Sequence, residues 1–358
     1  MKTTARLIHG DAACMAEVGD ESVDLVVTSP PYPMIEMWDG LFGQQAAGVE
    51  EALAAADGDR AFALMHGHLD AAWREVHRAL RPGGIACINI GDATRTLGGE
   101  FRLYSNHSRV IACLSQLGFV PLPDILWRKP TNAPNKFMGS GTLPAGAYVT
   151  YEHEYILIAR KGKRRLFTQP GEKALRRQSA FFWEERNSWF SDVWFDLRGA
   201  GQKLVDPASR ERSAAFPFEL AYRLVCMHSI KGDVVLDPFS GTGMTAAAAM
   251  AAGRSSIAVE IDPGLLAVAE NMLGSLAGFA NEYTRERLHR HVEFARRRAQ
   301  EGGGMKHVNR NYLFPVVTSQ ERDLIFNDIA SISGGNGSIC ARYDEEPQTD
   351  FTGNRKDA

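Results

Sequence analysis

The chain has 358 residues, a formal net charge of −3 and 44% hydrophobic residues, which is enough apolar material for one large α/β core with an inserted lobe. No apolar run reaches the ~20 residues that span a bilayer, and the N-terminus lacks the apolar segment of a signal peptide, so we expect a soluble cytoplasmic protein that does not contact membranes. The five cysteines include no Cys-x-x-Cys pair, which argues against a disulfide framework and against a metal site.

The first informative element is a predicted buried strand at residues 23–28 that runs into the loop Ser29-Pro30-Pro31-Tyr32. Two consecutive prolines remove two N–H donors and stiffen the backbone, so this loop presents a rigid rim of carbonyl acceptors. Ser29 adds a hydroxyl and Tyr32 an aromatic face, a combination that suits a planar base carrying an exocyclic amino group. An isolated loop of this kind is more often a structural turn, so its interpretation depends on a second motif.

Helices and strands alternate between the first loop and residue 160, which favours a mostly parallel sheet flanked by helices. Residues 33–64 contain a proline and several glycines, and we expect them to form a mobile insertion that can fold over DNA. Residues 128–150 are also rich in proline and glycine and are predicted to form a surface loop. The remaining predicted elements are helices near 65–80 and 104–117 and strands near 85–90, 120–127 and 154–160.

A basic stretch mixed with aromatic residues follows the strand at 154–160. Between residues 160 and 186, nine lysines and arginines outnumber three glutamates. Positive charge beside aromatic rings suits phosphate neutralisation together with base contacts. The alternative is a solvated loop beside an aromatic core patch. The residues that we expect to contact DNA are Lys163, Arg164, Arg165, Arg176 and Arg177.

The second motif is a glycine loop between a predicted strand at 234–237 and an alanine-rich helix at 243–252. Gly241 and Gly243 allow the backbone to approach a ligand closely, and Asp237 at the end of the strand can receive a cationic amino group. This helix follows another one predicted at 216–229.

An acidic residue completes this second motif. A strand near 256–260 ends in Glu260, about twenty residues beyond the glycine loop, where doubly wound folds usually hold a ribose diol. Position 246 is alanine, so the spacing departs from the dinucleotide Gly-x-Gly-x-x-Gly pattern, and the chain has no Gly-x-x-x-x-Gly-Lys-Ser/Thr phosphate loop. The methionine half of S-adenosylmethionine carries an ammonium and a carboxylate, which Asp237 and the adjacent backbone N–H groups match. The sequence therefore favours S-adenosylmethionine over NAD or ATP.

The C-terminal part contains a second basic patch at 285–298 with helical spacing, in which Leu288, Val292 and Ala295 share one face. This helix either flanks DNA or lies on the core, and the sequence does not decide between the two. Three glycines at 302–304 then interrupt the chain, and we expect the end from residue 334 onward to be mobile.

In its two motifs and in their order, the sequence resembles the β class of DNA amino-methyltransferases, in which the catalytic loop precedes the cofactor loop. Short segments that agree with this resemblance extend over residues 5–270. It implies a Rossmann-like S-adenosylmethionine-dependent methyltransferase fold with an inserted target-recognition region. The implied divisions are a catalytic half at 1–160, a target-recognition region at 161–212, a cofactor-binding half at 213–280 and a C-terminal extension at 281–358.

The resemblance implies a flipped base and direct methyl transfer to its amino nitrogen. Methylation of cytosine C5 would need a thiolate that follows a proline in that family, and no Pro-Cys dipeptide occurs here. We expect Ser29 and the Pro30 carbonyl to accept hydrogen bonds from the amino group, with Tyr32 stacked on the base. The catalytic residues are thus Ser29, Pro30, Pro31 and Tyr32. The expected cofactor-binding residues are Asp11, Phe216, Asp237, Pro238, Phe239, Gly241, Gly243 and Glu260.

Serine at position 29 favours N4 of cytosine, because a serine there goes mainly with N4-cytosine and an aspartate mainly with N6-adenine in the family that the chain resembles. Methylation at N6 of adenine is the alternative, and an RNA or small-molecule methyltransferase is a lesser one. A non-catalytic, cofactor-sensing DNA-binding module is disfavoured because both motifs are intact. The expected partner is double-stranded DNA, with a cognate restriction endonuclease that acts separately; the sequence leaves the oligomeric state open.

Overall fold

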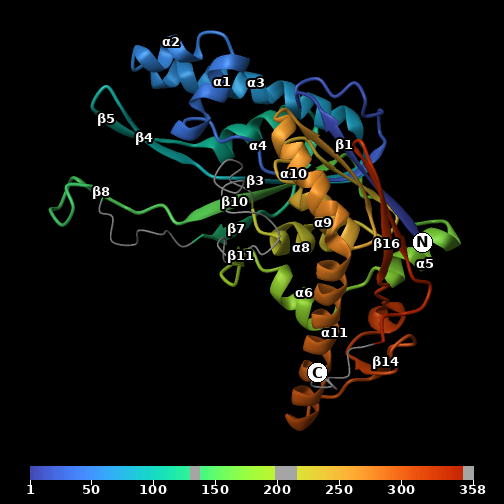
Figure 1. Ribbon diagram of the computed structural model, residues 1–358. Coiled ribbons are helices and arrows are strands. Elements are labelled where there is room, and N and C mark those ends of the chain that lie inside the picture. The colour runs from blue at the N-terminus through green and yellow to red at the C-terminus, as the bar shows by residue number, and fades with distance from the viewer. Residues whose placement is uncertain (130–137, 198–215, 350–358) are drawn as a thin grey trace, which may run out of the picture.

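The computed structural model describes residues 1–129, 138–197 and 216–349 (Figure 1). Eleven strands of the described residues form one sheet, in the order β11-β7-β10-β3-β2-β12-β13-β1-β17-β16, with β6 paired to β10. These strands are β1 (Lys2–His9), β2 (Val23–Thr28), β3 (Leu80–Ile90), β6 (Phe119–Pro121), β7 (Ile125–Arg128), β10 (His153–Lys161), β11 (Val193–Trp194), β12 (Val234–Asp237), β13 (Ser255–Glu260), β16 (Ile329–Gly335) and β17 (Ser338–Tyr343).

The centre of the sheet is parallel and its flanks are antiparallel. Strands β3, β2, β12, β13 and β1 run parallel to their neighbours, whereas β10 is antiparallel to β3 and β17 is antiparallel to β1. All six residues of β2 are buried, as expected for a strand covered on both faces. The α/β fold with a mostly parallel central sheet is therefore confirmed.

Helices cover both faces of the sheet. One apolar cluster contains residues of α8, α9, α10 and α11, and a second contains residues of α1 to α4. None of the helices in the described part of the chain is long and apolar enough to cross a membrane. The helices are α1 (Asp39–Gln45), α2 (Val49–Ala54), α3 (Gly58–Ala79), α4 (Asn106–Gln116), α5 (Pro170–Gln178), α6 (Trp183–Trp189), α8 (Phe218–His228), α9 (Met244–Ala251), α10 (Pro263–Gly274) and α11 (Leu276–Gln300), with 3-10 turns η1 (Glu36–Trp38) and η2 (Ser319–Asp323).

Three short hairpins lie outside the main sheet. They are β4 (Ala93–Leu97) with β5 (Glu100–Tyr104), β8 (Met138–Gly139) with β9 (Ala147–Tyr148), and β14 (His307–Val308) with β15 (Pro315–Val316). The first two project from the body on the same side (Figure 1). Phe101 of β5 and Tyr148 of β9 stack with ring centroids 4.7 Å apart, so these two hairpins contact each other.

Two segments that we expected to be mobile form regular structure instead. Residues 33–64 contain η1, α1, α2 and the start of α3, and Phe42, Val49 and Ala52 in them are fully buried. At the C-terminus, β16 and β17 form a hairpin whose second strand pairs with β1. Glycine and charge in these segments suggested mobility, but long-range apolar contacts and strand pairing order them.

The helix expected at 285–298 is part of the longer helix α11, and it packs on the core. Leu288 and Ala295 on its predicted apolar face are buried, and Val292 is half-buried. Arg287 and His291 also point inward, where they contact Glu185 and Glu184 of α6 at 2.7 Å each. The structure thus supports the interpretation of this segment as an amphipathic helix laid on the core.

Candidate active site

A cavity of about 310 Å³ lies at the carboxyl ends of the parallel strands, where doubly wound folds bind their ligands. Its wall brings together the loops that follow β1, β2, β12 and β13, which lie far apart in the sequence. All the expected catalytic residues line it, as do all the expected cofactor-binding residues except Gly243. The predicted residues that line it are Asp11, Ser29, Pro30, Pro31, Tyr32, Phe216, Asp237, Pro238, Phe239, Gly241 and Glu260.

The catalytic loop is held by the strand that precedes it and by the helix that covers it. Thr28, the last residue of β2, donates its hydroxyl to Asp237 Oδ1 at 2.6 Å, which joins the two motifs directly. On the other side of the loop, Asn106 of α4 donates to the carbonyls of Pro33 at 3.1 Å and Gly91 at 2.9 Å. The loop is therefore fixed at both ends by buried side chains.

The Tyr32 hydroxyl is the centre of a polar network that the sequence did not reveal. It donates to Glu154 Oε2 at 3.0 Å, it accepts from Asn89 Nδ2 at 2.8 Å, and it lies 3.1 Å from Ser29 Oγ. Asn89 also donates to the same Glu154 oxygen at 2.7 Å. Burial, with the neighbouring Glu154 carboxylate, raises the pKa of Tyr32 well above its ordinary value, so the phenol stays protonated.

Lys129 extends the same network to the surface of the cavity. Its ammonium group donates to Glu154 Oε1 at 2.8 Å, and its side chain is about half exposed. Lys129 and Glu154 lie in segments that carried the family resemblance, but their spacing of 25 residues gives no sign of contact. The contact arises because β7 and β10 pair antiparallel, with Trp127 opposite Glu154.

The insertion after the catalytic loop also lines the cavity. Ile35, Met37, Trp38, Leu41 and Gln45, from η1, α1 and the turn before them, form part of its wall. Met37 is 51% exposed, so this apolar wall reaches the mouth of the cavity. The insertion thus contributes to the cavity as helices and turns, and its expected closure over DNA stays a prediction.

The cofactor loop needs its glycines for different reasons. Gly243 is the N-cap of α9 with φ of 84°, and a Cβ there would lie 2.9 Å from Ala269 Cβ, so only glycine fits. Gly241 has φ of 52° and donates its N–H to Glu260 Oε2 at 2.7 Å. Gly243 therefore shapes the loop from behind, whereas Gly241 lies at the cavity wall.

Glu260 is held by backbone donors at the end of β13. Besides the Gly241 N–H, its other oxygen accepts from the N–H groups of Ile261 and Asp262 at 3.0 Å each. Burial raises the pKa of Glu260, while these backbone hydrogen bonds oppose the shift. These three hydrogen bonds leave one acceptor position on Oε2, which suits a hydroxyl of a ribose.

Asp237 is a buried carboxylate without a cationic partner among the described residues. It accepts from Thr28 and from the Phe239 N–H at 3.2 Å. Burial raises the pKa of Asp237 to about 6. In the same loop, the buried hydroxyl oxygens of Ser240 and Thr242 have no hydrogen-bond partner. A ligand with an ammonium and a carboxylate would pair with Asp237 and with Ser240, both of which line the cavity.

Asp11 and Phe216 lie at the edges of the cavity. Asp11 follows β1 and accepts the Ala13 N–H at 2.8 Å, so it also stabilises its own turn. Phe216 lies two residues before α8 and is 7% exposed. Phe239, which also lines the cavity, lies edge-to-face on Trp73 of α3, with ring centroids 6.0 Å apart.

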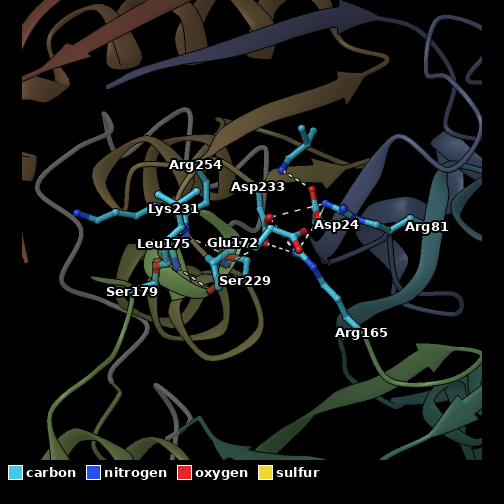
Figure 2. A network of polar contacts seen from close by, with 12 residues as sticks. Asp24, Arg81, Arg165, Glu172, Leu175, Ser179, Ser229, Lys231, Asp233 and Arg254 are labelled. Atoms are coloured by element: carbon cyan, nitrogen blue, oxygen red, sulfur yellow. Dashed lines mark hydrogen bonds and ion pairs between the residues drawn. The ribbon is translucent and has the colours of Figure 1, made fainter. Parts of the chain in front are cut away.

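The structure places the expected DNA-binding residues away from this cavity, and none of the five lines it. Arg165 donates to Asp24 at 3.0 Å and to Asp233 at 2.8 Å, in a network that also contains Arg81 (Figure 2). Asp24 lies at the start of β2 and Asp233 immediately precedes β12, so Arg165 lies at the opposite end of these strands from the cavity. It acts there as the counter-ion of two buried carboxylates.

The other four basic residues differ in their contacts. Arg176 lies over the Phe167 ring at 4.7 Å, and Arg177 pairs with Asp323 at 3.0 Å. Lys163 and Arg164 are exposed. Three of the neighbouring aromatic residues, Phe182, Trp189 and Trp194, are buried in the core, as the alternative interpretation of this segment supposed. Part of the expected target-recognition region, residues 198–212, lies outside the described residues.

Comparison with known proteins gives the same assignment as the two loops. The DNA methylase family model, which covers N6- and N4-methyltransferases, matches residues 23–271, more than half of the chain. The chain belongs to this family. It is 51% identical over 325 residues to the type II methyltransferase M.MthZI of Methanothermobacter thermautotrophicus, a match that covers 90% of each chain. It is 49% identical over 283 residues to the type II methyltransferase M.MjaI of Methanocaldococcus jannaschii, covering 76% of this chain and 92% of that one.

A solved structure gives the cofactor. A putative DNA modification methylase of Thermus thermophilus, complexed with S-adenosyl-L-methionine, superimposes with a TM-score of 0.58 at 34% identity and covers 75% of this chain and 92% of that chain. This DNA methylase therefore uses S-adenosylmethionine, as the unpaired hydroxyls of the glycine loop and the buried Asp237 indicate. When bound, this cofactor supplies the electrophilic methyl group of its sulfonium.

Proposed function

We propose that this DNA methylase transfers the methyl group to N4 of a cytosine flipped out of duplex DNA. The observation that carries the proposal is the serine hydroxyl in the catalytic loop, which lines the cavity between the Tyr32 ring and the loop that holds Asp237. A base in a duplex hides its amino group in a pair, so it must leave the stack before this loop can reach it.

The roles of the loop residues follow from their chemistry. The Tyr32 ring would stack on the flipped base. Ser29 Oγ and the Pro30 carbonyl would accept hydrogen bonds from the amino group and aim its nitrogen at the methyl carbon. The cofactor would supply the methyl group and leave as S-adenosylhomocysteine, and the amino nitrogen would lose one proton to solvent. Asp237 and Gly241 would hold the methionine half, and Glu260 would hold the ribose.

Cytosine is favoured over adenine because of the residue type at position 29. An ionised aspartate accepts more strongly from an amino group than a neutral serine hydroxyl does. In the β class, serine at this position goes mainly with N4-cytosine. A serine hydroxyl can also accept from the amino group of an adenine, so N6-adenine is the second candidate function.

We also propose that the protein belongs to a type II restriction-modification system. The relatives M.MthZI and M.MjaI carry the name type II methyltransferase, and the first of them matches over 90% of both chains. A cognate endonuclease would then act separately on the same site in duplex DNA. Transformation with a plasmid that encodes this endonuclease tests the idea, because only host cells that already carry the methyltransferase should survive.

The test of the base assignment is expression in a host that lacks DNA methylation, followed by single-molecule sequencing that distinguishes N4-methylcytosine from N6-methyladenine. We expect N4-methylcytosine in one short motif. N6-methyladenine would overturn the assignment of Ser29 but keep the fold and the cofactor. Ser29→Ala and Tyr32→Ala provide controls, because both should abolish the mark while the protein still binds S-adenosylmethionine.

A further inference from the structure

The Tyr32 hydroxyl has every hydrogen-bonding position filled. A phenol donates one proton and accepts two hydrogen bonds. Glu154 is a carboxylate and accepts the Tyr32 proton at 3.0 Å, while Asn89 Nδ2 donates to the phenol oxygen at 2.8 Å. The remaining contact, with Ser29 Oγ at 3.1 Å, must then be a hydrogen bond that Ser29 donates.

This assignment of protons fixes the direction of the Ser29 hydroxyl. Because its proton points to Tyr32, the lone pairs of Ser29 Oγ are left for a ligand in the cavity that Ser29 lines. An oxygen in this state accepts from an amino group without first reorienting. Two residues outside the catalytic loop, Asn89 and Glu154, therefore determine how the loop presents its acceptor.

Residues from three neighbouring strands hold the Tyr32 network in place. Asn89 comes from β3 and Glu154 from β10, and the register places Ile156 opposite Asn89. Asn89 donates to Glu154 Oε2 at 2.7 Å as well as to Tyr32, so the two side chains hold each other. Lys129, which follows β7, donates to the second Glu154 oxygen at 2.8 Å. The side chain of Glu154 is only 12% exposed, so this cation compensates much of the cost of burying its charge.

Packing leaves the Tyr32 ring little freedom on one side. A Cβ at Gly91 would lie 3.1 Å from Tyr32 Cε2 and 3.3 Å from Glu154 Cγ, so the ring and the carboxylate stem lie directly on that glycine. The Gly91 carbonyl is itself held by Asn106 at 2.9 Å. The ring is thus fixed by packing against backbone on one side and by its hydroxyl at its end.

We infer that Asn89 and Glu154 are positioning residues for methyl transfer, which act through the Tyr32 hydroxyl to hold the aromatic ring and the Ser29 oxygen in the geometry that the amino group needs. This inference rests on the proposed role of Tyr32 and Ser29 at the flipped base, and it holds for cytosine and for adenine. A small misplacement of a reacting group lowers the reaction rate more than the binding affinity. Substitution of Asn89 or Glu154 should therefore lower kcat.

The test is a double-mutant cycle on duplex DNA that carries the site mapped in vivo. We expect Glu154→Gln to lower kcat about 10- to 100-fold, because one amide oxygen cannot accept from both Lys129 and the Tyr32–Asn89 pair. Asn89→Ala should lower it about 10-fold for the loss of one donor. Tyr32→Phe keeps the ring but removes the hydroxyl, and in that background Glu154→Gln should cost less than about threefold more, because the two changes remove one interaction.

Glu152→Gln is the matched control. Glu152 precedes the same strand and pairs with Arg128 at 3.2 Å, and it does not line the cavity, so its substitution should leave kcat within about twofold. The affinity for S-adenosylmethionine, measured by calorimetry, should be unchanged in every variant, which shows that the variants fold. Equal costs of Glu154→Gln in the wild-type and Tyr32→Phe backgrounds would overturn the inference.

The outcome for Tyr32 separates this inference from the proposed function. If Tyr32→Phe has full activity while Tyr32→Ala has none, the ring acts as proposed but the hydroxyl network does not position it, and the inference fails alone. If Tyr32→Ala also keeps full activity, the proposed role of the loop fails and the inference fails with it. A 2-aminopurine at the target position adds a second readout, because its fluorescence should be less quenched in Glu154→Gln when the Tyr32 ring stacks poorly.

Discussion

Asp237, which we propose binds the ammonium group of the cofactor, is buried at a cost to the free protein. It is buried at the end of β12, with hydrogen bonds from Thr28 and the Phe239 N–H but with no cation among the described residues. Burial raises the pKa of Asp237 to about 6, although these hydrogen bonds oppose the shift. A buried carboxylate of this kind favours a ligand that brings its own positive charge.

The affinity for S-adenosylmethionine should therefore depend on pH below neutrality. A raised pKa means that Asp237 is protonated below pH 6 and cannot pair with an ammonium, so the affinity should be full above about pH 7 and weaken toward pH 5, by at most about tenfold per unit. Asp237→Asn should weaken binding by about 1.5–3 kcal/mol at pH 8 and reduce the pH dependence. Calorimetric titrations from pH 5 to 8 measure both. A wild-type affinity that is flat over this range would contradict the argument.

At the scale of elements, Arg165 and helix α6, which lie between β10 and α8 in the sequence, tie together distant parts of the fold. Arg165 joins the starts of β2 and β12 through Asp24 and Asp233, and α6 is tied to α11 through Glu185 and Arg287. Basic and aromatic composition predicted a DNA-contacting region here, but composition does not distinguish an arginine that faces a phosphate from one that faces a buried carboxylate. The arrangement of the strands decides which of these two groups the arginine contacts, and composition does not give that arrangement.

Substitutions of the neighbouring residues Arg165 and Arg164 should thus have different effects on the free energy of unfolding. Asp24 and Asp233 have side chains only 4% and 5% exposed, so Arg165→Ala leaves two buried charges poorly compensated and should lower the free energy of unfolding by about 3–5 kcal/mol. Arg164 is exposed, so Arg164→Ala should change stability by less than about 0.5 kcal/mol. Urea denaturation compares the two. A stable Arg165→Ala protein that binds DNA more weakly would restore its role as a DNA contact.

Local signals and long-range pairing explain which parts of the molecule could be read from the sequence. Both cavity loops were predicted because each is marked, within about a dozen positions, by an apolar strand and a following run that contains prolines or glycines. The hydrogen-bond partners of the Tyr32 hydroxyl were not predicted, because Asn89 and Glu154 come together only through the antiparallel pairing of β3 with β10. The strand β17 was missed for the same reason, since its partner β1 lies at the other end of the chain.

For the whole molecule, the divisions drawn along the sequence do not correspond to separate bodies in space. Strand β2 of the N-terminal half pairs with β12 of the cofactor half, and β1 lies between β13 and β17. The C-terminal extension therefore completes the sheet at one edge. It also supplies most of a third apolar cluster, in which Phe182, the N-cap of α6, and Leu288 of α11 pack against Phe314, Val316, Leu324 and Phe326.

Removal of the C-terminal extension should consequently destabilise the methyltransferase fold itself. Deletion of residues 304–358 strips β17 from β1 and leaves an unpaired strand edge, which promotes aggregation. It also removes Tyr343, whose hydroxyl donates to the Met250 carbonyl of α9 at 2.6 Å and lies 2.9 Å from Thr3 Oγ1 of β1. We expect this truncated chain to be recovered mainly as aggregate and to bind S-adenosylmethionine poorly.

Two further variants make this prediction quantitative. Deletion of residues 350–358 removes none of the described strands and should leave the midpoint of thermal unfolding unchanged. Tyr343→Phe keeps the ring but removes one of the donors to the Met250 carbonyl, which still accepts the Gly253 N–H at 3.0 Å, so it should lower the free energy of unfolding by about 1 kcal/mol, the net contribution of one hydrogen bond. If the chain ending at residue 303 instead unfolds at the wild-type temperature and still methylates DNA, the extension is an accessory rather than a part of the fold, and the pairing of β1 with β17 contributes little to stability.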